Sequence, residues 1–244
     1  MTIADNLTSI RKRIAGAAEG CGRAPSGVKL VAVSKTKPIG DIIEAINAGQ
    51  FAFGENYAQE LRDKSKLVPP SPQPSPQGRG GPARTIEWHF IGHLQKNKVK
   101  YVVPAASWIH TIDSVGLLQE IGKRLSSGQV NCLIEVNIAD EESKSGVKPG
   151  DVIDLVRSFA DVSAALDGRL MLRGLMCMPP VSDDPETSRP YFKRLKSLLD
   201  DINSRKVYGE PLTELSMGMT QDFKVAIEEG STIVRVGTAI FGIR

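Results

Sequence analysis

The feature that most constrains the fold of this sequence is a regular alternation of short apolar runs with helical patterns. The apolar runs lie at residues 29–34, 51–54, 87–91, 108–112, 131–137, 170–176, 213–216 and 232–236. The helical patterns between them lie at residues 39–49, 56–66, 95–100, 114–127, 148–165, 187–203 and 222–229. Strands that alternate with helices form parallel sheets. We therefore predict an α/β fold, a (β/α)8 TIM-type barrel that forms a single domain over residues 1–244.

An additional helix is predicted before the first strand. Ile3, Leu7, Ile10 and Ile14 recur at helical spacing, which predicts an amphipathic helix over residues 4–19. No helix is expected after the last strand, because only a few residues follow it. We expect the N-terminal helix to cover the seam between the first and last strands instead.

One segment departs from this alternation. Residues 68–84, VPPSPQPSPQGRGGPAR, are rich in Pro, Gly, Ser and Gln. Proline removes backbone donors and the segment has few apolar side chains, so it suits neither a helix nor a core strand. We predict a flexible surface insertion, with a proline-rich docking motif as the alternative.

Charge and cysteine content exclude several classes of protein. The 31 basic and 28 acidic residues are mixed along the chain and give a net charge of only +3, so neither nucleic acid nor a membrane is expected as a partner. The three cysteines form no CxxC motif, which is typical of a reduced cytoplasmic protein without disulfides or a zinc site. No apolar run approaches the roughly 20 residues of a transmembrane helix. The basic cluster at 11–13 suggests a transit peptide, but Asp5 and Glu19 argue against it.

The end of the first strand carries the first candidate for chemistry, because barrel enzymes place their sites at the carboxyl ends of strands. In LVAVSKTKP, residues 30–38, alternation places Val31, Val33 and Lys35 on one face. If that face lines the barrel, burial lowers the pKa of the lysine and leaves a free amine that can attack a carbonyl. A Schiff-base lysine is the specific interpretation; two solvated lysines at a strand end is the simpler one.

The ends of the last two strands predict a phosphate site. Barrels often bind phosphate in the loops after these strands, and small residues let it approach the backbone. Ser216 and Gly218 follow one strand, and Gly237 and Thr238 follow the other. Each glycine alone is equally consistent with an ordinary turn.

Arg235 interrupts the last apolar run, where a charge needs a partner or a ligand. One interpretation is a structural ion pair with a neighbouring strand. The other is a donor to a ring nitrogen of a ligand. A carbonyl-capturing amine, a phosphate cup and a ring-facing cation together point to pyridoxal 5'-phosphate.

The string HFIGH places His89 and His93 four residues apart, but no Glu follows His89 and no third ligand is in register. It therefore does not match a zincin motif, and no metal site is predicted. We expect His89 to pack near the mouth of the site.

Several long strings resemble one known family, the pyridoxal phosphate homeostasis proteins, which are single-barrel relatives of the N-terminal domain of alanine racemase. The strings are VAVSKTKP, FGENYAQE, WHFIGHLQKNK, VNIADEESKSG, RGLMCMPP and LSMGMTQDFKVAIEEGSTIVRVGTAIFG. The resemblance spans residues 4–66 and 85–244. The insertion at 68–84 departs from the family pattern.

The resemblance implies a cofactor site. Lys35 would hold pyridoxal 5'-phosphate as an internal aldimine, Asn56 would lie near the ring, and Arg235 would face the pyridine nitrogen. The family positions that form the phosphate cup match Ser216, Gly237 and Thr238.

The resemblance also implies a role. Members of the family maintain vitamin B6 homeostasis as cofactor carriers or regulators without an established reaction, and are mostly cytosolic and commonly monomeric. No catalytic residue is therefore predicted, and apoenzymes that depend on pyridoxal phosphate are the candidate recipients.

An enzyme is the main alternative, as an amino-acid racemase or a related pyridoxal-phosphate enzyme. Arg235 cannot usefully accept or release a proton, so a facing ring nitrogen stays unprotonated and the ring is a poorer electron sink. A racemase then needs a second acid–base group, which alanine racemases take from an added β-domain that we expect to be absent here. Tyr57 and His89 are the candidates for a weak base. A third alternative is a barrel that binds a phosphorylated metabolite without Schiff-base chemistry.

Overall fold

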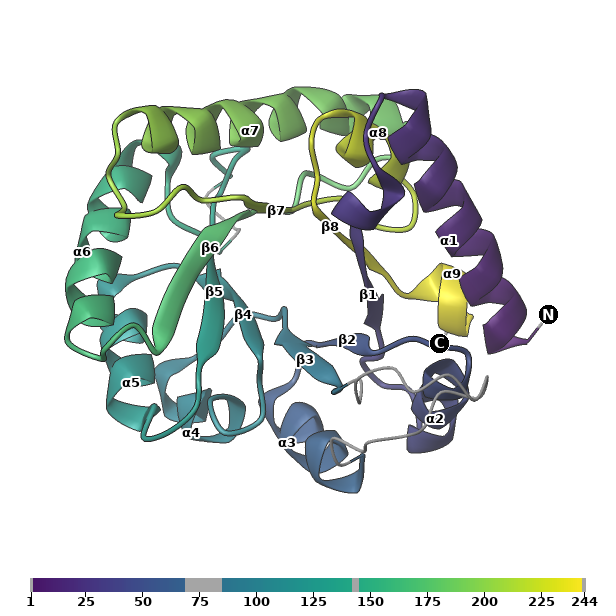
Figure 1. The fold of residues 1–244 in the computed structure, drawn as a ribbon, viewed down its shortest axis with the longest axis horizontal. Helices are drawn as coiled ribbons and strands as arrows, with labels where there is room; N and C mark the ends of the chain where they lie inside the picture. The colour runs from purple at the N-terminus through teal and green to yellow at the C-terminus, as the bar shows by residue number, and fades with distance from the viewer. Residues whose placement is uncertain (1, 69–84, 142–144, 243–244) are drawn as a thin grey trace.

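The computed structural model describes residues 2–68, 85–141 and 145–242. Eight parallel strands close into a barrel in chain order, with helices around them (Figure 1). The strands are β1 (Lys29–Val33), β2 (Ala52–Glu55), β3 (Glu87–Phe90), β4 (Trp108–Ile112), β5 (Val130–Glu135), β6 (Leu170–Met176), β7 (Glu214–Ser216) and β8 (Ile233–Val236). The predicted barrel and its eight strands are confirmed.

The helices follow the predicted alternation. They are α1 (Ile3–Gly20), α2 (Ile39–Asn47), α3 (Ala58–Leu67), α4 (Val99–Val102), α5 (Val115–Arg124), α6 (Val152–Ala164), α7 (Arg189–Ser204), α8 (Phe223–Glu228) and α9 (Thr238–Phe241). Short 3-10 helices span Pro25–Gly27, Lys96–Lys98, Pro149–Asp151 and Pro185–Ser188. The expectation of no helix after the last strand is wrong. A single turn needs only the four residues of α9, and Lys37 Nζ donates to the carbonyls at its end, Phe241 O at 3.0 Å and Gly242 O at 3.2 Å.

Helix α1 covers the seam between β8 and β1, as predicted. It begins with a capping box between Thr2 and Asp5, which satisfies two backbone donors at the helix start. Its buried face packs beside α2, α8 and α9, next to the two seam strands (Figure 1). The buried residues on that face are Leu7, Ile10, Ile14 and Ala18.

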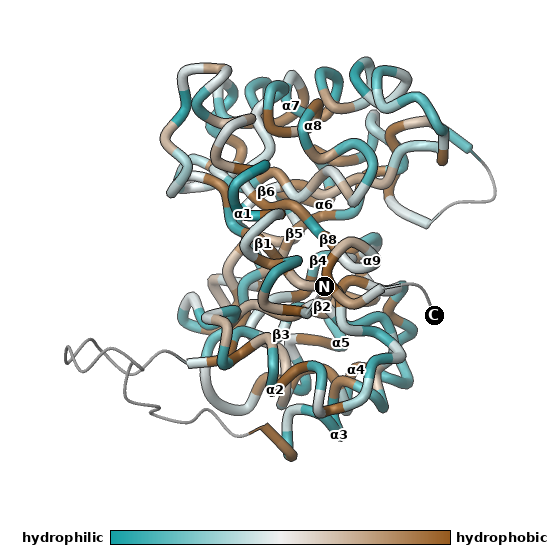
Figure 2. The backbone as a smooth tube through the Cα atoms, turned by 90° about the vertical axis from the view of Figure 1, so that its right-hand side faces the viewer, coloured by the Kyte–Doolittle hydropathy of each residue, from teal (hydrophilic) through white to brown (hydrophobic). Residues whose placement is uncertain are grey.

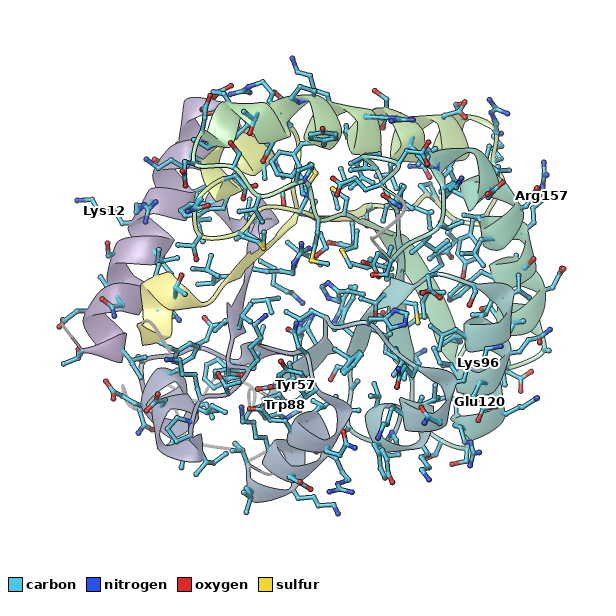
Figure 3. All side chains as sticks on the ribbon, turned by 180° about the vertical axis from the view of Figure 1, so that it is seen from behind. Lys12, Tyr57, Trp88, Lys96, Glu120 and Arg157 are labelled. Carbon is cyan, nitrogen blue, oxygen red and sulfur yellow. The ribbon has the colours of Figure 1, made fainter. Side chains whose placement is uncertain are left out.

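The apolar core has two parts. The larger part fills the space between the strands and the helices, and along the helices hydrophobic and hydrophilic segments alternate (Figure 2). Charged side chains such as Lys12, Glu120 and Arg157 point outward from the helix ring (Figure 3). The smaller part lies among the barrel strands and consists of Val31, Ala52, Trp108, Leu133, Met176 and Ile233. Buried polar side chains, among them His89, His110 and Arg235, share the strands with it.

Two further observations concern the limits of the fold. No helix in the described ranges is long and apolar enough to span a bilayer. The predicted insertion at 68–84 lies, apart from Val68, outside the described residues.

Candidate functional site

A cavity of ≈390 Å³ opens at the carboxyl ends of β1, β7 and β8, where a barrel site is expected. Four of the six predicted site residues line it: Lys35, Arg235, Gly237 and Thr238. The other two, Asn56 and Ser216, do not line it.

The first strand delivers Lys35 to this cavity. Val31 is fully buried inside the barrel, and Val33 and Lys35 line the cavity further along the same face. The chain then turns at Thr36, whose φ of +63° is unusual for a β-branched residue. The Thr36 N–H donates to Glu60 Oε1 at 2.7 Å, which holds the turn against α3.

A buried ionic network supports that turn from outside the barrel. The Ser34 hydroxyl donates to Glu55 Oε1 at 2.6 Å, and Lys64 Nζ donates to the same atom at 2.8 Å. Lys64 Nζ also donates to Ser34 O and to Glu60 Oε1. Burial raises the pKa of Glu55, and the hydrogen bonds from Lys64 and Ser34 oppose that rise. The network fixes the base of the Lys35 turn.

Two lysines, Lys35 and Lys37, follow the end of β1. Both border the cavity, but Lys37 Nζ bonds the carbonyls that end α9, as described above. Lysine near the carboxyl end of a helix is favourable because it meets unpaired carbonyls. Lys37 is therefore tied to the end of α9, and the two neighbouring lysines form a natural pair for mutation.

The loop after β7 is built around glycine. Gly218 has φ of +93°, and a Cβ there would lie 2.6 Å from Ala226 Cβ and 2.9 Å from Phe223 Cα. Asp222 fixes the same loop, because its carboxylate accepts from the Met219 N–H at 2.7 Å and from the Ser188 hydroxyl at 2.9 Å. A side chain at position 218 would therefore strain the backbone and displace α8.

Sequence reasoning missed Thr220 as a residue of this loop. It lines the cavity, and the Thr238 hydroxyl lies 3.3 Å from its own, so the two loops after β7 and β8 meet there. Gly237 brings the second loop close to β1, since a Cβ on it would lie 3.2 Å from Val33 O. A hydroxyl two residues beyond Gly218 was the available signal for Thr220, because the loop extends past its glycine.

Arg235 is 4% exposed, and within the described part of the chain its hydrogen bonds go only to neutral oxygens. Its Nη1 donates to Ser216 O at 2.8 Å and to Ser216 Oγ at 2.5 Å, and its Nη2 donates to Cys177 O at 3.0 Å. Burial lowers the pKa of this guanidinium. The ion pair considered from the sequence is not found among residues 2–68, 85–141 and 145–242.

Ser216 and Asn56 are not part of the lining of the cavity. Ser216 is fully buried beneath Arg235, and its hydroxyl also lies 2.9 Å from His110 Nδ1. Asn56 follows β2 and packs against Gly92, where a Cβ would lie 2.2 Å from Asn56 O. The buried Oδ1 of Asn56 has no hydrogen-bond partner in the described part of the chain. Their roles toward a cofactor stay predictions.

The sequence predicts that His89 packs near the mouth of the site. This prediction is wrong. It is fully buried, its ring stacks on Trp108 at 5.5 Å, and its Nε2 lies 3.4 Å from Glu87 at the start of β3. Strand alternation turns this position into the barrel, where the neighbouring strands enclose it.

Glu135 is a second residue that sequence reasoning did not select. It ends β5, is 3% exposed, and accepts from the Ser145 hydroxyl at 3.2 Å, while its Oε2 has no hydrogen-bond partner among the described residues. Burial raises its pKa, and the nearby charge of Arg235 opposes that rise. The charges of Glu135 and Arg235 therefore influence each other's pKa values.

Comparison with known proteins fits this geometry. The family model for the alanine racemase N-terminal domain matches residues 5–244. A pyridoxal phosphate homeostasis protein from Pasteurella multocida is 40% identical over 246 residues, covering 100% of this chain and 98% of the relative. The chain belongs to the pyridoxal phosphate homeostasis protein family.

Solved structures related to this family member agree in fold. A protein of unknown function from Bifidobacterium adolescentis is 38% identical, with a TM-score of 0.84 over 98% of this chain and 94% of that one. PipY of Synechococcus elongatus, solved with PLP bound, is 28% identical, with a TM-score of 0.79 over 99% of this chain and 100% of that one. This chain thus shares its fold with both proteins over nearly the whole length of each.

Proposed function

We propose that this chain binds pyridoxal 5'-phosphate through Lys35 and maintains vitamin B6 homeostasis as a carrier without strong catalytic activity. The observation that carries the proposal is that Lys35, Arg235, Gly237 and Thr238 line one cavity of ≈390 Å³. Full-length relatives named for pyridoxal phosphate homeostasis and the PLP-bound structure of PipY support it.

The residues of the cavity fit the chemical groups of this cofactor. A primary amine suits its aldehyde, and hydroxyl and glycine residues at Thr220, Gly237 and Thr238 suit its phosphate. The crowding at Gly218 shows a loop shaped so closely that a side chain does not fit. The Oδ1 of Asn56, directly after β2, the neighbour of β1, is a buried hydrogen-bonding atom without a partner in the described residues.

Each residue has a defined task in this proposal. When bound, pyridoxal 5'-phosphate supplies an aldehyde that condenses reversibly with amines. Lys35 supplies the amine from a turn held by Glu60. Arg235 presents a permanent positive charge to the ring nitrogen and exchanges no proton with it. Thr220 and Thr238 supply hydroxyl donors where the two loops meet.

The residues that line the cavity support the proposal that the protein has no strong catalytic activity. Within the described residues it contains no tyrosine or histidine that can act as a base opposite Lys35. Tyr57 is 53% exposed at the start of α3, and His89 is enclosed in the barrel. Solvent deuterium exchange at Cα across a panel of amino acids tests this point. Rapid exchange that disappears in Tyr57→Phe would establish the racemase-type alternative instead.

We further propose that residues 1–244 act as a single cytoplasmic domain and a monomer, with pyridoxal-phosphate-dependent apoenzymes as recipients. The full-length match to relatives supports the single unit. Light scattering measures the oligomeric state. Recovery of activity by an apoenzyme mixed with the loaded protein, compared with an equal amount of free cofactor, measures transfer.

The decisive experiment is the absorbance spectrum of the protein with pyridoxal 5'-phosphate, before and after borohydride reduction. We expect a protein-bound band, a reduced pyridoxyl mass on Lys35, and loss of both in Lys35→Ala. Lys37→Ala is the matched control and should keep both. A band that persists in Lys35→Ala would place the cofactor on another lysine, and the absence of any bound cofactor in the native sequence would overturn the proposal.

A further inference from the structure

A continuous line of polar side chains runs from Arg235 through the barrel interior. Arg235 Nη1 contacts Ser216 Oγ at 2.5 Å, Ser216 Oγ lies 2.9 Å from His110 Nδ1, and His110 Nε2 lies 2.9 Å from His89 Nδ1. His89 Nε2 then lies 3.4 Å from Glu87 Oε2, without hydrogen-bond geometry. The first four residues are at most 4% exposed and come from β8, β7, β4 and β3.

The chemistry of Arg235 sets the direction of every hydrogen in this line. A guanidinium only donates, so Ser216 Oγ accepts from it and its own hydrogen is free for His110 Nδ1. Burial lowers the pKa of both His110 and His89, so both rings are neutral. A neutral imidazole that accepts at Nδ1 carries its hydrogen on Nε2. His110 therefore donates to His89 Nδ1, and His89 carries its own hydrogen toward Glu87.

With this direction of the hydrogen bonds, the dipoles of the line stabilise the positive charge of Arg235. The negative end of each dipole faces Arg235 and the positive end faces Glu87. The contact with His89, and the pairing with Lys29 at 2.6 Å, lower the pKa of Glu87 to about 2 despite its partial burial, so it is a carboxylate at neutral pH. The line thus compensates a buried cation by oriented neutral groups, with a carboxylate only at its far end.

The two rings are also held in place. Trp108 stacks on His89 with an angle of 7° between the ring planes, and it meets His110 edge-on at 6.1 Å between centroids. Aromatic contacts of this kind fix ring orientation as well as adding packing energy. The hydroxyl of Ser216 is therefore presented to Arg235 by a rigid support.

We propose that His110 and His89 are positioning residues that hold Ser216 as an acceptor for Arg235 and so fix the guanidinium at the cofactor cavity. The proposal rests on the proposed function, because the cofactor ring is the group that Arg235 faces. The positioning role extends the site beyond the lining of the cavity, to Ser216, His110 and His89 on three further strands.

The first test is independent of any cofactor. Nitrogen-15 spectra of the imidazole rings in the ligand-free protein distinguish the two neutral tautomers. We expect both His89 and His110 to be neutral with the hydrogen on Nε2. A hydrogen on Nδ1 of either buried ring, or a charged ring at neutral pH, would overturn the proposed direction.

The second test measures binding of pyridoxal 5'-phosphate by absorbance in three variants. We expect His110→Leu to weaken binding about tenfold and to shift the absorbance maximum of the bound cofactor, because the Ser216 hydroxyl that accepts from Arg235 is no longer held in place. His110→Asn keeps an acceptor near the position of Nδ1 and should recover most of both losses. Ser163→Ala removes another buried hydrogen bond, from Ser163 to Leu170 O, and controls for stability alone.

The outcomes separate the two proposals. Normal binding and an unshifted band in His110→Leu would overturn the positioning role and leave the proposed function intact. An equal loss in Ser163→Ala, or no recovery in His110→Asn, would likewise attribute the effect to stability and overturn that role. Failure of the native protein to bind the cofactor would overturn the proposed function and the positioning role together, whatever the tautomers.

Discussion

Two buried cations of this barrel are stabilised in opposite ways. Lys64 is 7% exposed and lies between two carboxylates, 2.8 Å from Glu55 and 2.6 Å from Glu60. Arg235 is 4% exposed and meets two carbonyls and one hydroxyl. Lys64 lies outside the strands, under the Lys35 turn, whereas Arg235 lines the cavity.

This difference in partners shows how a buried cation can remain available to interact with a ligand. A cation in direct contact with carboxylates is neutralised, and its charge serves the fold. A cation that meets neutral oxygens remains charged toward the cavity, at a cost that oriented dipoles reduce. The two should therefore respond differently when each is removed.

The largest expected effect is on stability, in Lys64→Met. The change leaves Glu55, which is fully buried, without its cationic partner, and removing one member of a buried pair typically costs about 3–5 kcal/mol. Urea unfolding measures the loss. Lys66→Met on the same helix is the control, since Lys66 is exposed. A loss below about 1 kcal/mol would show that the ionic network does not hold the turn.

Arg235→Met should be less costly to the fold and more costly to binding. It leaves neutral oxygens unpaired rather than a stranded carboxylate, so we expect a loss of about 1–3 kcal/mol in unfolding free energy. Affinity for pyridoxal 5'-phosphate should fall at least about tenfold, because the ring loses its facing charge. A loss of stability equal to that of Lys64→Met would remove the distinction between the two cations.

The same contrast shows what the sequence reveals and what it does not. Strand alternation correctly places Val33 and Lys35 on the inner face, because a period of two is a local property. The partners of Arg235 come from strands far apart in the chain, and lateral neighbours depend on the register of the closed barrel, which no local pattern contains. The sequence therefore places His110 and Ser216 on two predicted strands, but it does not predict that their side chains contact each other.

Short elements escape prediction for a related reason. Helix α9 has only four residues, too few for a helical period to appear, whereas the long amphipathic face of α1 was evident. The left-handed turn at Thr36 was also unexpected, because threonine rarely adopts it. It depends on Glu60, whose role follows only from the packing of α3 against the end of β1.

Glu135 tests how far the charge of Arg235 acts on a nearby carboxyl group, through the pH dependence of stability. Burial raises its pKa in the folded state, so the folded protein binds this proton more tightly than the unfolded chain does. Below the ordinary value of 4.5 the group is protonated in both states; as the pH rises above it, stability falls until the folded carboxyl also ionises. We expect Glu135→Gln to remove this decline in thermal unfolding curves measured across pH. An unchanged pH profile would show that the hydrogen bond from Ser145 and the charge of Arg235 together offset the burial completely.

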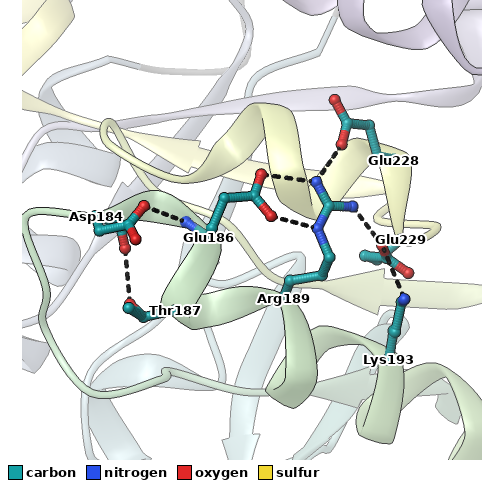
Figure 4. Close-up of polar contacts among 7 residues, drawn as sticks. All are labelled: Asp184, Glu186, Thr187, Arg189, Lys193, Glu228 and Glu229. Atoms are coloured by element: carbon teal, nitrogen blue, oxygen red, sulfur yellow. Dashed lines mark hydrogen bonds and ion pairs between the residues drawn. The ribbon is translucent and has the colours of Figure 1, made fainter.

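The smallest effect is expected where ion pairs are most numerous. Arg189 contacts Glu186 at 2.6 Å, Glu228 at 2.6 Å and Glu229 at 2.5 Å, joining the start of α7 to α8 at the surface (Figure 4). Hydrogen bonds to Glu186 and then to the other two carboxylates raise the pKa of Arg189, yet solvent screens exposed pairs.

Arg189→Ala should lower the unfolding free energy by at most about 1 kcal/mol, an effect that diminishes at high salt. Cofactor affinity should not change, because Arg189 does not line the cavity. Urea unfolding at low and high salt measures both the loss and its screening. Three carboxylates around the partly exposed Arg189 then contribute less than the two around buried Lys64, because the free energy of a broken pair depends on the burial of the charge left behind. A loss as large as that of Lys64→Met would mean that the number of carboxylates, and not burial, sets the cost.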